Sequence, residues 1–278
     1  MPIIDHDIHL HTYLSSCCSD KEHHRPGAII TLAEEMGLNT IGFSDHIWAN
    51  PDLEPNDWYR PQDESQISRL RSNLAAVSTD IRVLIGCEAD TAAPGKFSIT
   101  PEFAQGLDYV LLACNHFHLK DVVQQPESDS AYDIARHILA FFISGVRSGL
   151  ATSIAHPFIP YGYLHQYDQA IATISEAEFL DTFGIASEMG VGIEITVSFF
   201  PPKPEQDSPP QPCWNIETPI RVLSLAKQAG CKFTFGTDAH CPERQRRLPE
   251  LSFFEKILGL TGRDVLAVSD MEGNSINA

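Results

Sequence analysis

Metal-binding side chains alternate along two short segments near the two ends of the chain. Asp7, His9 and His11 are spaced two residues apart near the start, and Asp238 and His240 have the same spacing near the end. Alternate residues of a strand point to one face, so each segment directs its side chains to one place. A mixture of neutral imidazole and carboxylate suits zinc, manganese or iron. The spacing therefore predicts a metal site built from both ends of the chain.

Further candidate ligands stand at the ends of other apolar runs. They are His46, Glu88, His116 and His156. So many candidates exceed what one tetrahedral ion uses. A bridging carboxylate, for which Glu88 is the natural candidate, can hold two ions close enough to clamp both sides of a displacement reaction. We therefore expect two or three divalent metal ions, drawn from zinc, manganese and iron.

The elements that must position these residues alternate between strand-like and helix-like runs, which predicts an α/β fold with parallel strands joined by helices. Seven strands are expected, which suggests a closed or nearly closed barrel. Reactive groups in such barrels lie at the C-terminal ends of the strands. The expected strands are Ile8–His11, Thr40–Ser44, Val83–Glu88, Tyr109–Asn115, Thr152–His156, Gly192–Thr196 and Lys232–Asp238. The expected helices are Ala28–Met36, Ser65–Val77, Ala131–Ser148, Glu176–Glu188, Pro219–Ala229 and Glu243–Leu258, and the proline-rich stretch from Pro201 to Pro212 is expected to be a long loop.

Composition narrows the class of protein. A chain of 278 residues with 43% hydrophobic content is expected to fold as a single domain over residues 1–278. Its apolar runs are far shorter than the roughly 20 residues of a membrane span. The acidic N-terminus lacks the pattern of a signal peptide. The seven cysteines follow no zinc-ribbon or disulfide framework, and Cys87 and Cys114 lie in strand-like runs, as core residues do. We therefore expect a cytoplasmic protein with reduced thiols.

The net charge of -18 disfavours a general affinity for nucleic acid, because binding to polyphosphate usually requires a basic surface. A small phosphorylated substrate is compatible with this charge, since bound metal ions would offset it locally. The sequence does not indicate an oligomeric state.

The motifs, in their order along the chain, resemble those of the PHP (polymerase and histidinol phosphatase) family. The resemblance runs from residue 7 to residue 240 and implies a distorted seven-stranded (β/α) barrel, TIM-barrel-like, with up to three metal ions at the C-terminal ends of its strands. The motifs are His9-Leu10-His11-Thr12, Ser44-Asp45-His46, Gly86-Cys87-Glu88, His116, Ile154-Ala155-His156-Pro157 and Gly236-Thr237-Asp238-Ala239-His240.

The resemblance also implies a distribution of ligands. The first ion would be held by His9, His11, Glu88 and Asp238, and the second by Glu88, His116 and His156. His46 and His240 would hold the third ion with one residue of the loop after Thr12. Relatives commonly have Asp or His in that loop. Counting forward from His11 points to Cys17, whereas counting back from Gly37 points to Asp20, which we favour because a hard carboxylate matches the other ligands.

Other residues near the predicted site receive supporting roles. His118 is a candidate substrate donor or proton carrier, and its alternative is a simple pairing with Asp121. Arg244, in the basic cluster after His240, is the candidate to hold a phosphate, although a solvated helix start is an equal alternative. We expect Asp7 and Asp45 to accept the free N–H of ligating imidazoles, and Glu194 either does the same or merely ends a buried strand. The remaining histidines are expected to be solvated: His6, His23, His24, His137 and His165.

These features predict a metal-dependent phosphoesterase that hydrolyses a small phosphomonoester with a metal-activated water. The resemblance to histidinol phosphatases implies a substrate similar to histidinol phosphate or a sugar phosphate. His118 and Asp238 are the predicted catalytic residues. The alternatives are a nuclease of the same family acting on short nucleic acids or nucleotides, a metal-binding module without catalysis, and a hydrolase of C–N bonds.

Overall fold

A parallel β-sheet forms the centre of the protein in the computed structural model, which describes residues 3–202 and 214–267. All seven predicted strands are present, and each lies within two residues of its expected start. They are β1 (His6–Leu10), β2 (Thr40–Phe43), β3 (Arg82–Ala93), β5 (Tyr109–Ala113), β6 (Ser153–Ala155), β7 (Gly192–Thr196) and β8 (Phe233–Gly236).

One strand is longer than its apolar run suggests. β3 continues past Glu88 to Ala93 and turns back through the short strand β4 (Lys96–Phe97), with which it pairs antiparallel. The predicted end at Glu88 was therefore too early. Because Glu88 and Asp90 are two residues apart on one strand, they face the same side of the sheet.

The sheet curves into a barrel. The strands follow the order β1, β2, β3, β5, β6, β7 and β8, and every neighbouring pair along this path is parallel. The two ends of this path meet where Leu10 forms an isolated parallel bridge with Ala239. There the His11 N–H donates to the Ala239 carbonyl at 3.0 Å, and the Ala239 N–H donates to the His9 carbonyl at 3.2 Å. The predicted fold class, a (β/α)7 barrel, is confirmed.

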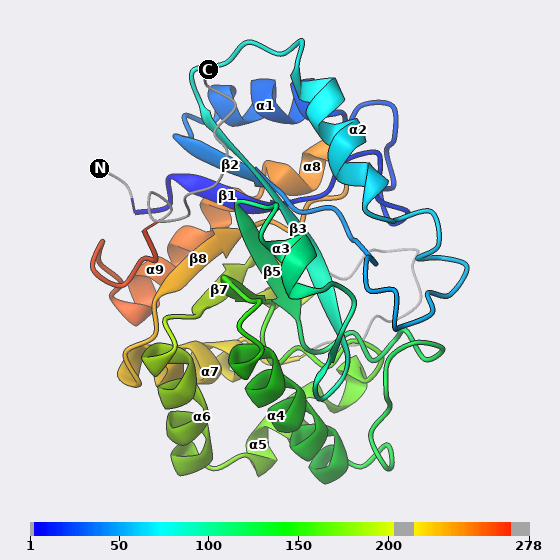
Figure 1. Cartoon of the computed structure of the whole chain (residues 1–278). Coiled ribbons are helices and arrows are strands. Elements are labelled where there is room, and N and C mark those ends of the chain that lie inside the picture. Colours follow the sequence, from blue (N-terminus) through cyan, green and yellow to red (C-terminus); the bar gives the residue numbers. More distant parts are fainter. Residues whose placement is uncertain (1–2, 203–213, 268–278) are drawn as a thin grey trace, which may run out of the picture.

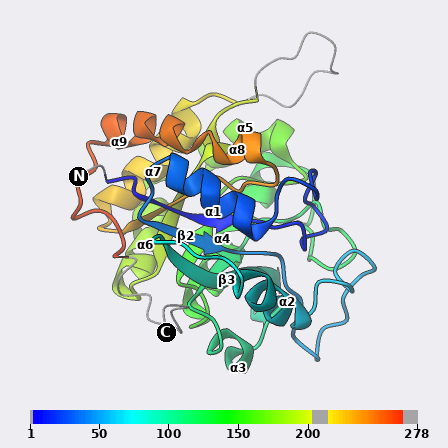
Figure 2. The same ribbon diagram turned by 90° about the horizontal axis from the view of Figure 1, so that it is seen from above.

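The helices lie outside the strands, with α1 and α2 near β1 to β3 and α4 to α7 near the later strands (Figures 1 and 2). The predicted helix Glu243–Leu258 is wrong as a single element. It is divided into α8 (Pro242–Gln245), a 3-10 turn (Leu248–Leu251) and α9 (Ser252–Leu258), because Pro249 begins a new turn and cannot donate a helical hydrogen bond. The other helices are α1 (Pro26–Glu35), α2 (Ser65–Leu74), α3 (Pro101–Ala104), α4 (Ala131–Arg147), α5 (Tyr167–Thr173), α6 (Glu176–Glu188) and α7 (Glu217–Gln228).

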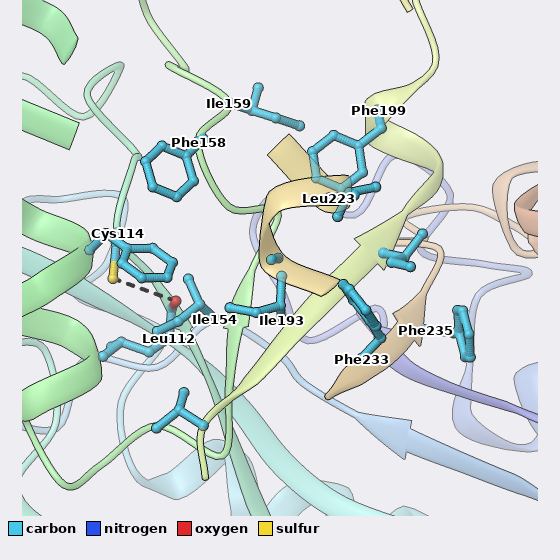
Figure 3. Close-up of a cluster of buried hydrophobic side chains, with 14 of the residues drawn as sticks. Leu112, Cys114, Ile154, Phe158, Ile159, Ile193, Phe199, Leu223, Phe233 and Phe235 are labelled. Carbon is cyan, nitrogen blue, oxygen red and sulfur yellow. Dashed lines mark hydrogen bonds between the residues drawn. The ribbon is translucent and has the colours of Figure 1, made fainter. Parts of the chain in front are cut away.

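Apolar side chains fill the space between the sheet and these helices. Leu112, Ile154 and Ile193 come from three neighbouring strands and converge with Phe233 of β8 (Figure 3). Cys114 is buried in the same cluster, where its thiol donates weakly to the Leu112 carbonyl. Cys87 is also buried, as predicted for both cysteines. This core fixes the strands whose ends carry the candidate ligands.

Among residues 3–202 and 214–267, none of the helices combines the length and the apolar character that crossing a bilayer requires. Most of the predicted proline-rich loop, from residue 203 onward, lies outside the described residues.

Replacement of Phe183 by alanine should destabilise the protein. Phe183 is fully buried on α6 between Phe142 and Phe158, and deletion of such a ring costs about 3–5 kcal/mol. Phe253→Ala is the matched control, because 38% of that side chain is exposed. Urea unfolding of the metal-free proteins should show a large loss of unfolding free energy for the first variant and a small one for the second. Equal losses would contradict this description of the core.

Candidate metal centre

All the predicted ligands except Asp20 lie at or beyond the C-terminal halves of the strands. His9 is near the end of β1, Glu88 lies within β3, and the other ligands follow their strands by one to four residues. His46, after β2, forms an isolated parallel bridge with Glu88. Closure of the barrel between β1 and β8 then brings the first and last ligands of the chain together. The ligands that follow their strands are His11, His46, His116, His156, Asp238 and His240.

The buried carboxylate of Glu88 lies at the centre of the group. Its two oxygens face different histidines. Oε1 lies 2.8 Å from His156 Nε2 and 3.5 Å from His116 Nε2. Oε2 lies 3.3 Å from one ring nitrogen of each of His9, His11 and His46. With an oxygen facing each set of histidines, Glu88 belongs to two potential ligand groups and could bridge two ions.

Two groups of potential ligand atoms match the predicted first and second metal positions. His9, His11, Glu88 and Asp238 form the first, and Asp238 Oδ1 lies 3.4 Å from His11 Nε2. The second group shares Glu88 and adds the histidines that follow β5 and β6. The ligand atoms of each group lie within 4.8 Å of one another.

The third group contains Cys17 in the place that the sequence analysis assigned to Asp20. Cys17 is grouped with His11, His46 and His240. The Asp20 carboxylate is turned outward, accepts a hydrogen bond from the His23 backbone N–H at 3.1 Å and lies 3.0 Å from the His23 ring. The preference for Asp20 is therefore corrected. A carboxylate matched the other ligands chemically, but the loop is short enough for Cys17 to reach the group.

The donor atoms of these groups fit bound cations. Within the ligand groups, three buried ring nitrogens have no hydrogen-bond partner, namely His9 Nε2, His11 Nε2 and His46 Nδ1. A buried polar atom without a partner costs about 1–3 kcal/mol, so such atoms are rare unless they serve a purpose. All three point toward the same Glu88 oxygen. Divalent ions in the first and third groups would satisfy these nitrogens, and the ion in the first group would also neutralise the carboxylate.

A second layer of carboxylates orients the ligating rings. His9 Nδ1 lies 2.7 Å from Glu194 Oε1, and the other oxygen of Glu194 accepts from the His156 backbone N–H. Glu194 fits in this place because Gly236 of β8 has no side chain, whereas a Cβ there would collide with Glu194 Oε1. These contacts favour the orienting role over the alternative that Glu194 merely ends a strand. They fix the ring so that Nε2 faces the site.

Asp90 orients the His116 ring in the same way, and it was not among the predicted site residues. Its Oδ1 lies 2.7 Å from His116 Nδ1, and Tyr59 donates to its other oxygen. The i, i+2 spacing of Glu88 and Asp90 was the available signal, but β3 was expected to end too early for Asp90 to be considered.

The predicted roles of Asp7 and Asp45 require revision. Asp7 accepts from the backbone and hydroxyl of Thr237 and from the His9 backbone, so it connects β1 to the residues after β8 without contacting an imidazole. Asp45 acts indirectly. It accepts from the Ser15 hydroxyl, and Ser15 Oγ in turn lies 3.2 Å from His11 Nδ1.

Charge and burial oppose each other within the site. Burial alone would raise the pKa of the Glu88 carboxyl, but the surrounding imidazoles, His46 and His9 foremost, hold it well below its usual range. Burial lowers the pKa of His116, yet Asp90 and Glu88 outweigh it and raise this pKa to about 9. Burial and nearby carboxylates raise the pKa of the Cys17 thiol. An ion that bound at His116 or Cys17 would therefore have to displace a proton, whereas Glu88 would meet it already ionised.

Two ligands have unusual backbone conformations. His156 has φ 31° and Asp238 has φ 51°, and both lie in the left-handed region that residues other than glycine rarely adopt. Such conformations cost about 1–3 kcal/mol and cluster at functional sites. The chain thus accepts local strain at the points where β6 and β8 deliver their ligands.

A cavity of about 370 Å³ opens above the ligands, and His118 is one of its lining residues. The ring of His118 lies 5.1 Å from that of His116 and faces Tyr161. Arg244 is anchored beside the cavity, where Nη2 lies 3.1 Å from Asp238 Oδ2 and Nε donates to the Thr237 carbonyl. Both candidate substrate-binding residues are therefore near the predicted metal positions.

Two of the histidines that were expected to be solvated are buried. His6 packs on Phe235 and accepts a hydrogen bond from its backbone N–H, and His24 contacts the Ala239 carbonyl. Both rings pack where β1 meets the end of β8, so they are structural. His23 and His165 are exposed, as expected, and His137 is partly exposed.

Taken together, the strand order and the ligand groups define an α/β barrel with overlapping groups of side chains that could hold divalent metal ions. The PHP domain family matches residues 7–198, more than half of the chain. The protein therefore belongs to the PHP domain family, whose members are generally metal-dependent hydrolytic enzymes. Asp238 and His240 lie beyond the matched region, and closure of the barrel brings them to the same site.

Other comparisons add little. Among solved structures, the chain is similar to Xanthomonas albilineans dihydropteroate synthase with 4-aminobenzoic acid, with 13% sequence identity over 93% of this chain and 95% of that one. The TM-score of 0.34 is too low for this likeness to support a conclusion about fold or function. No curated protein matches the sequence significantly.

Replacement of Glu194 by glutamine should weaken metal binding. The change removes the charge that orients His9, and the loss of such an outer partner typically lowers metal affinity 10–100-fold. Glu176→Gln, on the exposed side of α6, is the control. Competition with a chromophoric chelator measures both affinities. An unchanged affinity in the Glu194 variant would contradict the orienting role.

Proposed function

We propose that the protein is a metal-dependent phosphatase that hydrolyses a small phosphomonoester. The observation that carries this proposal is the set of overlapping ligand groups around Glu88, with three buried and unpartnered imidazole nitrogens, at the floor of a cavity. Membership of a family of metal-dependent hydrolases supports the same reaction class.

The cations would be held by the three ligand groups described above, with Glu88 shared by the first two. The donors suit zinc, manganese or iron. When bound, such ions supply hydroxide at neutral pH and neutralise phosphoryl oxygens. Because the ions provide the nucleophile, no covalent intermediate with a side chain is required.

The protein side chains bind and orient the reactants. Asp238 directs Oδ1 toward the first ligand group, while Oδ2 accepts from Ser198 and Arg244. This arrangement lets Asp238 orient the attacking water. Arg244 adds positive charge beside the cavity, where it binds a phosphoryl oxygen. His118, at the cavity wall, donates a hydrogen bond to the leaving oxygen as a neutral imidazole, because burial and the neighbouring His116 lower its pKa to about 4.

The cavity favours a small substrate. Its volume of about 370 Å³ lies at the lower end of the range for small-molecule sites. Trp58 and Tyr161 contribute aromatic surface to its wall, which suits the ring of an imidazole- or sugar-bearing phosphate such as histidinol phosphate. The net charge of -18 disfavours a nuclease. The free thiols of the described cysteines agree with our proposal that the protein works in the reducing cytoplasm.

His9→Ala and Asp238→Ala should each lower phosphatase activity at least about 100-fold, because each removes a ligand of the first group. Loss of a residue that only orients a ligand already lowers activity about 10–100-fold, and loss of the ligand itself should cost at least as much. The measurement is hydrolysis of a panel of phosphomonoesters and short oligonucleotides, with circular dichroism to confirm folding. His165→Ala, which removes an exposed imidazole, is the control. Activity that survives both substitutions would refute the site. Hydrolysis of the oligonucleotides alone would replace the phosphatase proposal by the nuclease.

Removal of metal should abolish activity reversibly. Dialysis against a chelator is expected to leave a folded but inactive protein, because the core does not include the ligand groups. Added manganese, zinc or iron should restore hydrolysis, and metal analysis should show at least two ions per chain in the active protein. Full activity in a protein shown to be free of metal would contradict the proposal.

A further inference from the structure

The loop that carries Cys17 is fixed on both sides of that residue. The Ser16 backbone N–H donates to Gln62 Oε1 at 2.9 Å, and its hydroxyl contacts the Trp58 carbonyl. On the other side, the Cys18 thiol donates to the His240 carbonyl at 3.4 Å. Cys18 is thus committed to a structural contact. Cys17, held between two anchored neighbours, lines the cavity instead.

The nitrogens around Cys17 are prepared for a cation. His46 Nδ1 and His11 Nε2 are buried without a hydrogen-bond partner. Both residues belong to the group that includes the Cys17 sulfur. His240 Nδ1 lies 2.9 Å from the Asp238 carbonyl, to which it donates. This contact leaves the lone pair of His240 Nε2 free to bind the ion. The unpartnered nitrogens are observations independent of the cysteine.

The third group differs chemically from the other two. His11 already belongs to the first group, so Cys17, His46 and His240 are the ligands specific to the third position. The first and second groups each contain a carboxylate, whereas this group contains a cysteine sulfur and imidazoles. A bound ion would convert the thiol to a thiolate. Thiolate ligands select zinc-like ions over manganese and magnesium, which prefer oxygen. Three protein ligands also leave a coordination position open, as in catalytic zinc sites.

We propose that the third position is a thiolate site in which Cys17, His46 and His240 hold a zinc-class ion, while the two carboxylate-containing positions accept harder ions as well. This inference rests on the proposed function in so far as both require cations around Glu88. It goes further by assigning different metal preferences within one centre. A protein loaded with manganese alone should therefore keep its third position empty.

Cobalt(II) tests the assignment, because a thiolate bound to cobalt gives an intense sulfur-to-metal charge-transfer band in the near ultraviolet, whereas imidazole and carboxylate do not. Titration of the metal-free protein with cobalt should give three bound ions per chain and this band. Cys17→Ser should lose the band and bind the third ion at least 10-fold more weakly. Cys17→Asp, which restores an anionic oxygen ligand, should bind three ions without the band and should also accept manganese at the third position.

The neighbouring thiols provide the control. Cys241 directly follows His240 but does not belong to the ligand group, so Cys241→Ser should keep the full band. A band that persists in folded Cys17→Ser, or cobalt binding by the unmodified protein without any band, would overturn the thiolate site. If the unmodified protein bound cobalt without the band but still hydrolysed phosphomonoesters, the phosphatase proposal would stand and the thiolate site would not. If the protein bound no cobalt, both proposals would fail.

Discussion

The structure depends on one buried carboxylate. Glu88 is 1% exposed, and five imidazoles surround its two oxygens, some with nitrogens that have no hydrogen-bond partner. A charge so far from water is stable only when it is paired or coordinated. Protons can compensate it in part, but divalent ions would satisfy the carboxylate and the imidazoles together. The remainder of the barrel is arranged so that these groups meet at one place.

Barrel closure and outer hydrogen bonds hold this arrangement rigid. Asp7 connects β1 to Thr237, so the first and last ligand-bearing segments are bound to each other as well as to the sheet. Glu194 of β7 orients His9, and Asp90 of β3 orients His116. The left-handed conformations of His156 and Asp238 show that the surrounding packing overrides local backbone preference there. The core thus supplies the energy that keeps a strained, polar site in place.

Much of this was predictable from the sequence, for specific physical reasons. Buried parallel strands appear as apolar runs, so all seven were located, and strand alternation placed His9 and His11 on one face. The predictions failed at residues whose positions are determined by tertiary contacts. Loop geometry, rather than ligand chemistry, selects Cys17 over Asp20. Asp90 was missed because a continuing strand carried it past an apparent end. The burial of His6 and His24 follows from barrel closure, which no local pattern reveals.

Anomalous X-ray diffraction from crystals of the purified protein tests the central claim most directly. Data collected at the zinc, manganese and iron absorption edges locate each ion and identify its element. We predict strong peaks on both sides of the Glu88 carboxylate. One should lie beside the unpartnered nitrogens of His9 and His11, and the other beside His116 and His156. Crystals of the active protein without anomalous density at Glu88, with water or side-chain contacts satisfying those nitrogens instead, would contradict it.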